Sequence, residues 1–372
     1  MTYFQAVVIA LIQGVTEMFP ISSLGHSVLV PAWFGGSWQS LVTQSSEANS
    51  ESSFYLAYIV ALHVATALAL LWFFRADWIR IIRGFLRSLP ASVRLSMQAR
   101  RLRLSVLDKD ERLAWMIIFA TIPVGLTGLL LEHVFRTLFA KPVAAAVFLL
   151  VNGLVLLAAE ALRRSTASRK QAGAPVTAVA ADRPVPVREP ARPQWEAAAP
   201  AYSGNPVYPG AAAAAAAPHS AAPVSHRGPS SGRAAADIAD AELSDERLSH
   251  LSYKDAIIIG SAQIFALLAG ISRSGITMAG GLWRGLDHED AARFAFLLAT
   301  PVILAAGVLK VPSLAGPAGA HIHGQVAVGF IICGIAAYLS VRFLVRWFQT
   351  RTLTPFAIYC LAFGLLSMVH FI

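Results

Sequence analysis

Long apolar runs alternate with short polar segments along most of this 372-residue chain. An α-helix needs about 20 mostly apolar residues to cross the hydrocarbon core of a bilayer, and a backbone in lipid must satisfy its hydrogen bonds internally. Six stretches meet this requirement and predict transmembrane helices: 54–74, 113–131, 142–162, 291–309, 325–347 and 354–371. The pattern therefore predicts an all-α integral membrane protein.

Two shorter apolar segments, 4–12 and 256–268, each lead into a polar motif that a second short apolar segment follows. We expect each to form a re-entrant helical hairpin, whose irregular tip is tolerated when it is buried in protein or faces water. The motifs QGVTEMFPISSLG and QIFALLAGISRSG share Gln, Ile, Ser and Gly at a constant offset of 250 residues. Three predicted spans separate them, an odd number, which predicts inverted-topology repeats with a polar site near the membrane midplane.

Residues 163–250 differ from the rest, with an alanine run at 211–217, many prolines and scattered charges of both signs. Such a stretch cannot bury enough apolar surface to become ordered. We therefore expect a first membrane repeat over 1–162, a disordered Ala/Pro-rich cytoplasmic linker over 163–250, and a second membrane repeat over 251–372. A spacer role for the linker is favoured over a regulatory or partner-binding role.

Only 14% of the residues are charged, and the net charge is +9. We interpret this excess as positive-inside bias rather than nucleic-acid binding, because ten Lys and Arg residues gather in 75–112 and none lies in 311–324. The segments 75–112, 163–250 and 342–353 are then cytoplasmic, and both termini lie outside. The N-terminus lacks the positive region of a cleaved signal peptide. Both cysteines fall within predicted spans, which favours apolar core residues over a disulfide or zinc site.

The first motif places polar side chains within an otherwise apolar stretch, where they are costly and usually functional. These residues are Gln13, Glu17, Ser22, Ser23 and His26. Gln13 and Glu17 are four residues apart and share one face of a helix. A carboxylate, a hydroxyl and an imidazole are the groups that a phosphoryl-transfer site needs. The alternative is a hydrated loop in which the serines only cap a helix.

The second motif, Gly270 to Thr277, contains an arginine flanked by Ser272, Ser274 and Gly275. Arg273 offers fork-like donors to phosphate oxygens, and the start of a helix adds backbone amides and a positive dipole end. The alternative pairs Arg273 with Glu17 only for packing, which is costly in lipid. Phosphate binding is the favoured interpretation.

Other histidines have weaker support. His63 lies within a predicted span, and a core histidine bonded to a neighbouring helix is favoured over a catalytic one. The run His288-Glu289-Asp290 is better explained as a solvated helix start.

The two motifs together resemble the two signatures of the undecaprenyl-diphosphate phosphatases, the bacitracin-resistance family. Phe54 to Trp78, Tyr253 to Pro301 and Thr354 to Tyr359 also look like that family, so the resemblance covers the membrane part and omits 163–250. It implies hydrolysis of undecaprenyl diphosphate to undecaprenyl phosphate and inorganic phosphate, which recycles the lipid carrier of cell-wall synthesis and confers bacitracin resistance. It also implies inverted repeats, a plasma-membrane location and a site that opens to the outer face.

By this resemblance, Glu17, Ser23, His26 and Arg273 are the catalytic residues. The residues expected to bind substrate are Ser22, Gly25, Ser272, Ser274, Gly275 and Thr277. A divalent cation, Mg²⁺ or Ca²⁺, is expected at Glu17 and Gln13. The expected partners are the polyprenyl diphosphate substrate and membrane lipid, with no nucleic acid and with homodimer formation left open.

The chain departs from the family pattern in four places. Gln13 stands where many members have a glutamate, which puts the metal coordination in doubt more than the reaction. Leu24 replaces a small polar residue, Ala269 replaces a proline, and the insertion 163–250 is not typical.

A transporter or flippase of an anionic polyprenyl phosphate lipid is the competing class, because inverted repeats with broken helices are also typical of carriers. The set Glu17, Ser23 and His26 favours the enzyme, since a carrier does not require it. The nucleophile stays open among Ser23, His26 and water. A membrane scaffold is a third, less favoured class.

Overall fold

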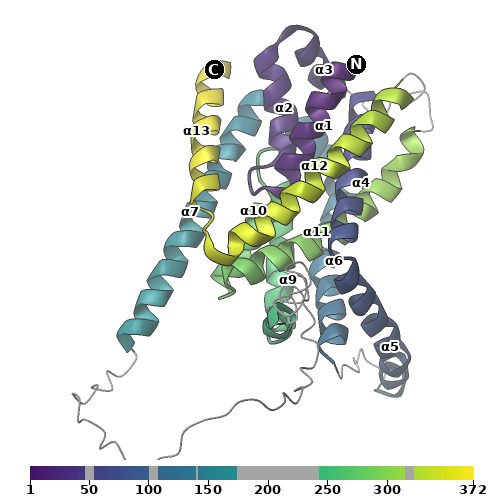
Figure 1. Cartoon of the computed structure of the whole chain (residues 1–372), viewed down its shortest axis with the longest axis vertical. Coiled ribbons are helices and arrows are strands. Elements are labelled where there is room, and N and C mark those ends of the chain that lie inside the picture. The colour runs from purple at the N-terminus through teal and green to yellow at the C-terminus, as the bar shows by residue number, and fades with distance from the viewer. Residues whose placement is uncertain (47–53, 100–107, 140, 174–242, 315–321) are drawn as a thin grey trace, which may run out of the picture. The chain divides into compact units, whose positions relative to one another are not determined.

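The computed structural model describes residues 1–46, 54–99, 108–139, 141–173, 243–314 and 322–372 (Figure 1). Contacts group the chain into a membrane unit, Met1–Ser168 with Asp237–Ile372, and a second unit, Arg169–Ala236. Only the last residues of α7 belong to the described part of the second unit. Every regular element among the described residues is a helix, which confirms the all-α prediction.

Five helices are long and apolar enough to cross a membrane, and they match five of the six predicted spans. They are α6 (Lys109–Phe139), α7 (Pro142–Gly173), α11 (His288–Leu314), α12 (His323–Thr350) and α13 (Thr354–Phe371). The sixth predicted span corresponds to α4 (Phe54–Phe73), which continues into α5 (Arg75–Ala99) after a bend of 84°. The described chain therefore has five spanning helices, or six when the bent pair is counted.

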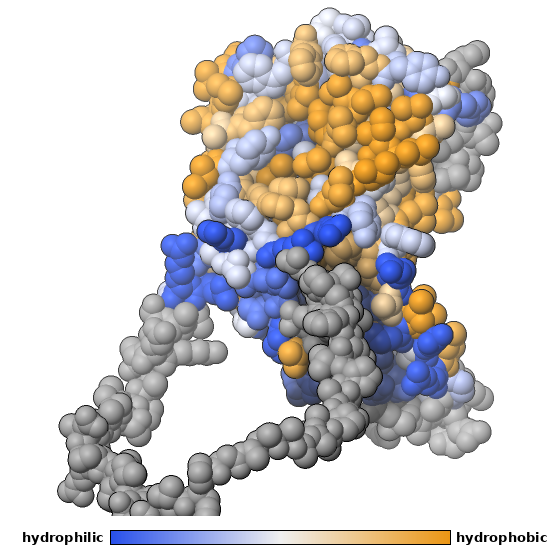
Figure 2. Space-filling model, in the orientation of Figure 1, coloured by the Kyte–Doolittle hydropathy of each residue, from blue (hydrophilic) through white to orange (hydrophobic). Residues whose placement is uncertain are grey.

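The outer surface of these helices is apolar, as lipid contact requires. Figure 2 shows a broad hydrophobic zone in the upper part of the molecule, with a hydrophilic band below it. Leu130 on α6, Ile331 on α12 and Val369 on α13 are 62–79% exposed. In water this much exposed apolar surface would promote aggregation, whereas in a bilayer it faces acyl chains.

Two helical hairpins lie among these spans. The first is α1 (Tyr3–Met18) followed by α2 (Ser23–Phe34), which leads into α3 (Gly36–Ser46). The second is α9 (Tyr253–Ser261) with a 3₁₀ turn (Ala262–Leu267), followed by α10 (Arg273–Trp283). At 1.5 Å per residue, α1 is about 24 Å long and α2 about 18 Å, both shorter than the hydrocarbon core. In Figure 1 the first hairpin descends from the end that carries both termini, and α9 lies toward the opposite end.

Each hairpin turn is built by its motif serine. Ser22 caps α2 by accepting a hydrogen bond from the amide of Gly25, and Ser272 caps α10 by accepting one from the amide of Gly275. The capping role that the sequence left as an alternative is thus present at both serines. The two caps share the same hydrogen bond but differ in backbone conformation, with φ of 70° at Ser22 and −83° at Ser272. The inverted-repeat relationship itself stays a prediction.

Small residues let the hairpins and spans pack closely, as is common between membrane helices. A Cβ atom on Gly14 of α1 would lie 2.5 Å from the carbonyl oxygen of Cys333 on α12. On α7, a Cβ atom on Gly153 would lie 2.9 Å from the carbonyl oxygen of Ala357 on α13. Both positions therefore require glycine to keep the observed helix spacing. Cys333 and Cys360 are buried free thiols, as predicted.

The predicted linker 163–250 is helical at both of its ends. α7 continues to Gly173, and residues 243–249 form a further helix. Asp245 in that helix is buried and contacts Arg80 on α5 and Arg293 on α11. The chain thus rejoins the membrane unit before residue 250, and the remainder of the predicted linker, 174–242, lies outside the described residues.

Candidate active site

The turns of the two hairpins meet inside the membrane unit. The hydroxyl of Ser22 in the first turn accepts a hydrogen bond of 3.2 Å from the amide of Gly270 in the second turn. In return, Ser272 and Ser274 donate to the carbonyl oxygen of Phe19. A Cβ atom on Gly25 would lie 3.0 Å from the Cα atom of Gly270. The two turns therefore come this close because a glycine of each turn lies at the point of contact.

One side chain from a spanning helix holds both turns. Asn152 on α7 donates to the carbonyl oxygen of Pro20 (3.0 Å), and its own oxygen accepts from the amide of Ser272 (3.0 Å). Asn152 is 1% exposed. Two irregular turns in the membrane interior carry backbone groups without helical partners, and this amide satisfies one group from each.

Ser22 has a left-handed backbone conformation, with φ of 70°. A non-glycine residue in this region costs about 1–3 kcal/mol and persists where the surrounding structure holds it. Its contacts with Gly25 and Gly270 supply that restraint. The strained turn directs Ser23, the next residue, back toward α1.

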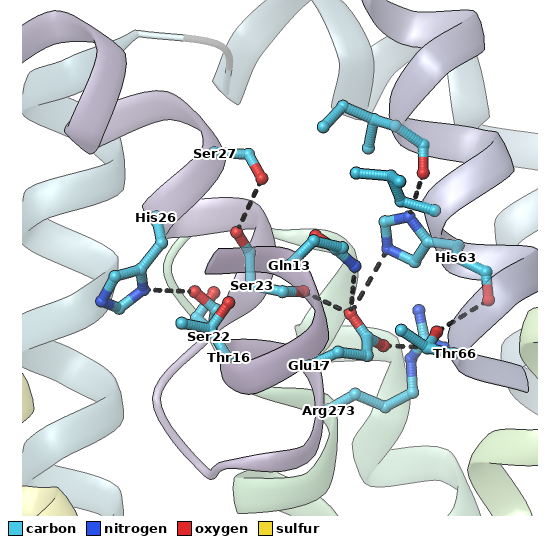
Figure 3. Close-up of polar contacts among 12 residues, drawn as sticks. Gln13, Thr16, Glu17, Ser22, Ser23, His26, Ser27, His63, Thr66 and Arg273 are labelled. Atoms are coloured by element: carbon cyan, nitrogen blue, oxygen red, sulfur yellow. Dashed lines mark hydrogen bonds and ion pairs between the residues drawn. The ribbon is translucent and has the colours of Figure 1, made fainter. Parts of the chain in front are cut away.

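Glu17 is the centre of a polar cluster where the two turns meet (Figure 3). Its Oε2 atom accepts hydrogen bonds from the hydroxyl of Ser23, at short distance, and from Nε2 of Gln13 at 3.0 Å. The Nη1 atom of Arg273 lies 3.8 Å from Oε1 of the same carboxylate. The structure therefore brings together four residues that the sequence singled out, from both motifs.

His63 on α4 completes this cluster. Its Nε2 atom lies 3.4 Å from Oε2 of Glu17, and its Nδ1 atom bonds the carbonyl oxygen of Ile59 at 2.8 Å. With the Nδ1 proton donated to that carbonyl, Nε2 is the ring atom that faces Glu17. The sequence favoured a core histidine here. One feature of the sequence did point to a functional role: His63 is an imidazole within an apolar predicted span, and ionisable side chains inside a membrane are usually functional.

His26 does not join this cluster. Its Nδ1 atom bonds the carbonyl oxygen of Ser22 at 2.7 Å, and its Nε2 atom bonds the hydroxyl of Tyr359 at 2.8 Å. The ring also stacks against Tyr359 and Phe363 of α13. In Figure 3 it points away from Glu17. Both ring nitrogens are therefore engaged: Nδ1 within the first turn of α2, and Nε2 in holding α2 against α13.

A small pocket of about 50 Å³ lies beside the cluster. Its lining comes from both motifs and from α4, and consists of Glu17, Ser22, Ser23, Leu24, His63, Ala266, Ile271, Ser272 and Arg273. The Nη1 atom of Arg273 is buried and has no hydrogen-bond partner among the described residues. An unpaired guanidinium nitrogen at a small pocket suits an anionic group with several acceptor oxygens.

The remaining predicted substrate-binding residues shape the pocket rather than face it. Thr277 donates to the carbonyl oxygen of Arg273, and Ser274 contacts Phe19 and Ser272. A Cβ atom on Gly275 would lie 3.1 Å from the Cβ atom of Ser272 and 3.2 Å from that of Pro20. These residues keep the second turn tight, so that Arg273 starts α10 at the pocket.

The expected cation ligands lie side by side, but they are few. The described residues contain no group of three His, Cys, Asp or Glu side chains that could hold a metal ion. Glu17 offers a carboxylate, and the Oε1 atom of Gln13 is buried without a hydrogen-bond partner among the described residues. Two protein oxygens suit a Mg²⁺-type ion that takes its other ligands from phosphate oxygens and water.

Comparisons with known proteins agree with the motif assignment. The family model described as Bacitracin resistance protein BacA matches residues 6–181 and 232–366. An undecaprenyl-diphosphatase 2 of Frankia alni is 56% identical over all of this chain and 98% of its own length. An undecaprenyl-diphosphatase of Mycolicibacterium paratuberculosis is 50% identical over 99% of this chain and 97% of its own. An undecaprenyl-diphosphatase 2 of Chromobacterium violaceum is 34% identical, with 99% of each chain covered.

Proposed function

Because this chain belongs to the bacitracin resistance protein BacA family, we propose that it hydrolyses undecaprenyl diphosphate to undecaprenyl phosphate and inorganic phosphate. The observation that carries the proposal is the Ser23–Glu17–Arg273 arrangement. A hydroxyl bonded to a carboxylate lies beside a guanidinium nitrogen that is 3.8 Å from the same carboxylate and has no hydrogen-bond partner among the described residues. These groups supply a nucleophile, a base and an anion binder, which phosphoryl transfer requires. A carrier does not require the first two, so the transport alternative is not favoured.

The substrate combines an anionic diphosphate with a long apolar tail. The tail lies among lipid and helices, while the diphosphate enters the pocket where the two turns meet. Arg273 binds the oxygens of the terminal phosphoryl group through its free Nη1 atom, and amides at the start of α10 add positive potential. Leu24 and Ile271 line the pocket and limit the access of water.

In the proposed first step, the Ser23 oxygen attacks the terminal phosphorus, and Glu17 takes the hydroxyl proton through the hydrogen bond that already joins them. The bond from that phosphorus to the bridging oxygen breaks, and the lipid monophosphate leaves with the bridging oxygen. Glu17 gives its proton to the departing lipid monophosphate and then takes one from the water that attacks the phosphoserine. The bond from phosphorus to the Ser23 oxygen breaks, that oxygen regains a proton from Glu17, and inorganic phosphate is released. His63 faces Oε2 of Glu17 and orients the carboxylate in both steps.

A divalent cation would be held by Glu17 and the amide oxygen of Gln13. When bound, it would neutralise charge on the diphosphate. Gln13 is neutral, so this chain supplies one carboxylate for the ion.

We place the protein in the bacterial plasma membrane, with the end of the molecule that carries both termini outside. The positive-inside rule supports this orientation, since both chain ends lie at one end of Figure 1 and the arginine-containing helix α5 lies at the other. The site then opens to the outer face. Homodimer formation stays a prediction.

The test is phosphate release from undecaprenyl diphosphate by the purified protein in detergent, with and without a chelator, beside Arg273→Ala. We expect release that requires a divalent cation and is lost in the variant. A variant with a near-normal rate would refute the phosphate-binding role of Arg273. Absence of release under every cation, with lipid phosphate still bound, would favour the carrier.

A further inference from the structure

The helix that follows α4 leaves the direction of the membrane span. The axes of Ala57–Phe73 and Arg75–Pro90 differ by 84°. α4 has 20 mostly apolar residues, whereas α5 carries an arginine at 75, 80, 83 and 87. A basic amphipathic helix that bends by nearly a right angle away from an apolar one suits the membrane surface better than the hydrocarbon core. Arg293 of α11 lies over the ring of Phe74 at 5.7 Å, which holds the bend from the inside.

The inner face of α5 is fixed by polar and close backbone contacts. Asp77 accepts from Arg80 at 2.6 Å and lies 2.9 Å from Arg293. A Cβ atom on Gly84 would lie 2.9 Å from the backbone of Asp110 on α6. Ser88 accepts a hydrogen bond of 3.0 Å from the indole of Trp115. These contacts recur along one side of the helix, so its rotation about its own axis is set.

The opposite face of α5 is both apolar and basic. Ile79, Ile82 and Leu86 are 48–58% exposed, and the side chains of Arg83 and Arg87 between them are exposed too. Within the described part of the chain, neither arginine has an acidic partner. Figure 2 shows hydrophobic and hydrophilic residues interleaved at the lower right, where Figure 1 places α5.

An apolar groove of about 500 Å³ adjoins this face. Its walls are α5 and α6, and its lining includes Trp78, Ile82, Phe85, Ile118, Ile122 and Leu126. The lining is almost entirely apolar and offers dispersion contacts to an acyl chain. Its polar groups are the indole nitrogen of Trp78, which has no hydrogen-bond partner among the described residues, and the hydroxyl of Thr121, which donates to the carbonyl oxygen of Ile117. The groove begins beside the arginines on α5 and follows α6, which is a membrane-spanning helix.

We propose that the outer face of α5, formed by Arg75, Ile79, Ile82, Arg83, Leu86 and Arg87, is an interfacial surface that binds anionic phospholipids. The aliphatic side chains enter the acyl boundary, the arginines contact lipid phosphates, and the groove receives an acyl chain. A helix with aliphatic and basic side chains on its exposed face is typical of binding to an anionic membrane surface. The proposal concerns a surface distinct from the hydrolytic site, and it does not depend on the reaction.

The test measures how deeply α5 lies in lipid. A nitroxide is attached at Ile79→Cys, and its collisions with oxygen and with a water-soluble nickel complex are compared in nanodiscs. The nanodiscs contain either phosphatidylcholine alone or phosphatidylcholine with phosphatidylglycerol. Leu130→Cys provides the lipid-exposed reference and Lys254→Cys the aqueous one. Cys333 and Cys360 are buried and do not compete for the label.

We expect the label at position 79 to resemble the lipid reference in phosphatidylglycerol nanodiscs. In the pair of changes Arg83→Gln and Arg87→Gln it should move at least halfway toward the aqueous reference. The matched control Arg342→Gln with Arg346→Gln removes the same charge from exposed positions on α12 and should leave the depth unchanged. Phosphate release should persist in both, which shows that they fold.

Two outcomes would overturn the proposal. A label that is accessible to nickel in both lipid mixtures would show that α5 stands away from the membrane. Equal immersion with and without phosphatidylglycerol, unchanged by loss of Arg83 and Arg87, would show an apolar contact without selection for anionic lipid. Because nanodiscs expose both membrane faces, neither outcome depends on the orientation proposed above.

Discussion

The imidazole of His63 on α4 and the carboxylate of Glu17 on α1 face each other, with Nε2 and Oε2 separated by 3.4 Å. This relationship links a spanning helix to the hairpin that carries the candidate nucleophile. It also distinguishes the roles of two histidines near the motifs, His63 and His26. His63 lines the pocket, whereas His26 holds α2 against Tyr359 on the other side.

We therefore expect different results from His63→Gln and His26→Gln. Loss of His63 should lower kcat by about 10²-fold or more with little change in thermal midpoint. Glu17, the proposed base, then loses the group that orients it, and a positioned base contributes about 10²–10⁴-fold. Loss of His26 should mainly lower the thermal midpoint, because it removes two hydrogen bonds and ring contacts. Phosphate release and thermal unfolding of both variants in one detergent measure this contrast. The opposite pattern would return catalysis to His26.

Ser23→Ala tests the covalent version of the reaction. We expect turnover to fall by at least about 10³-fold, because the attacking oxygen is lost and the oxyanion contacts alone provide limited rate enhancement. Ser27→Ala, one turn further along α2, is the matched control, since its hydroxyl only donates to the carbonyl of Ser23. Rapid quenching of the parent protein should also trap a phosphoserine. Full activity of Ser23→Ala would assign the attack to water.

Arg273→Lys tests whether the shape of the guanidinium matters in addition to its charge. Lysine keeps the charge but has no planar fork, so we expect the rate of phosphate release to drop about 10²-fold or more, as for loss of one preorganised donor to a developing oxyanion. Arg284→Lys, at the other end of α10, serves as control because it pairs with Asp255 outside the pocket. Equal rates for Arg273→Lys and the parent would show that a point charge suffices.

The sequence predicted the helices, both turns and the meeting of the motifs, because apolar length, proline and capping residues are local signals. It could not rank His63 against His26. Which face of a helix points at a site depends on helix rotation, and that is set by packing between distant segments. The offset of 250 residues places Ser23 opposite Arg273 in the two motifs. The two motifs thus supply different groups from equivalent positions, and neither motif alone contains the site.

The role of Asn152 could not be predicted from the sequence either, because a single asparagine on an apolar span does not indicate which groups it bonds. Its amide joins Pro20 in one turn to Ser272 in the other. We expect Asn152→Leu to leave the amide of Ser272 unpaired and the carbonyl of Pro20 with only a 3.9 Å contact from the thiol of Cys360. A buried backbone group without a partner costs about 1–3 kcal/mol. The thermal midpoint should fall and phosphate release should fall with it. An unchanged midpoint would show that the turns hold each other without α7.

The last prediction concerns the helix at 243–249, where the chain rejoins the membrane unit. Asp245 is 2% exposed and lies between Arg80 (2.6 Å) and Arg293 (3.0 Å). Nearby, the hydrogen bonds from Arg247 to Asp290 raise the pKa of Arg247, so its guanidinium stays charged. Breaking a buried ion pair costs about 3–5 kcal/mol when its partner is left unpaired. Without Asp245, both arginines keep Asp77 as an acidic partner, so we expect the cost to be a part of that range.

Asp245→Ala should therefore lower the thermal midpoint. Its neighbour Glu246 is exposed, and Glu246→Ala, which removes the same charge, should leave the midpoint within error. Protease cleavage should report the same difference, because a helix released from Arg80 and Arg293 becomes a substrate at 243–249 while the parent resists. Equal midpoints and equal cleavage for the two variants would mean that the charged contacts of Asp245 do not hold this helix in place.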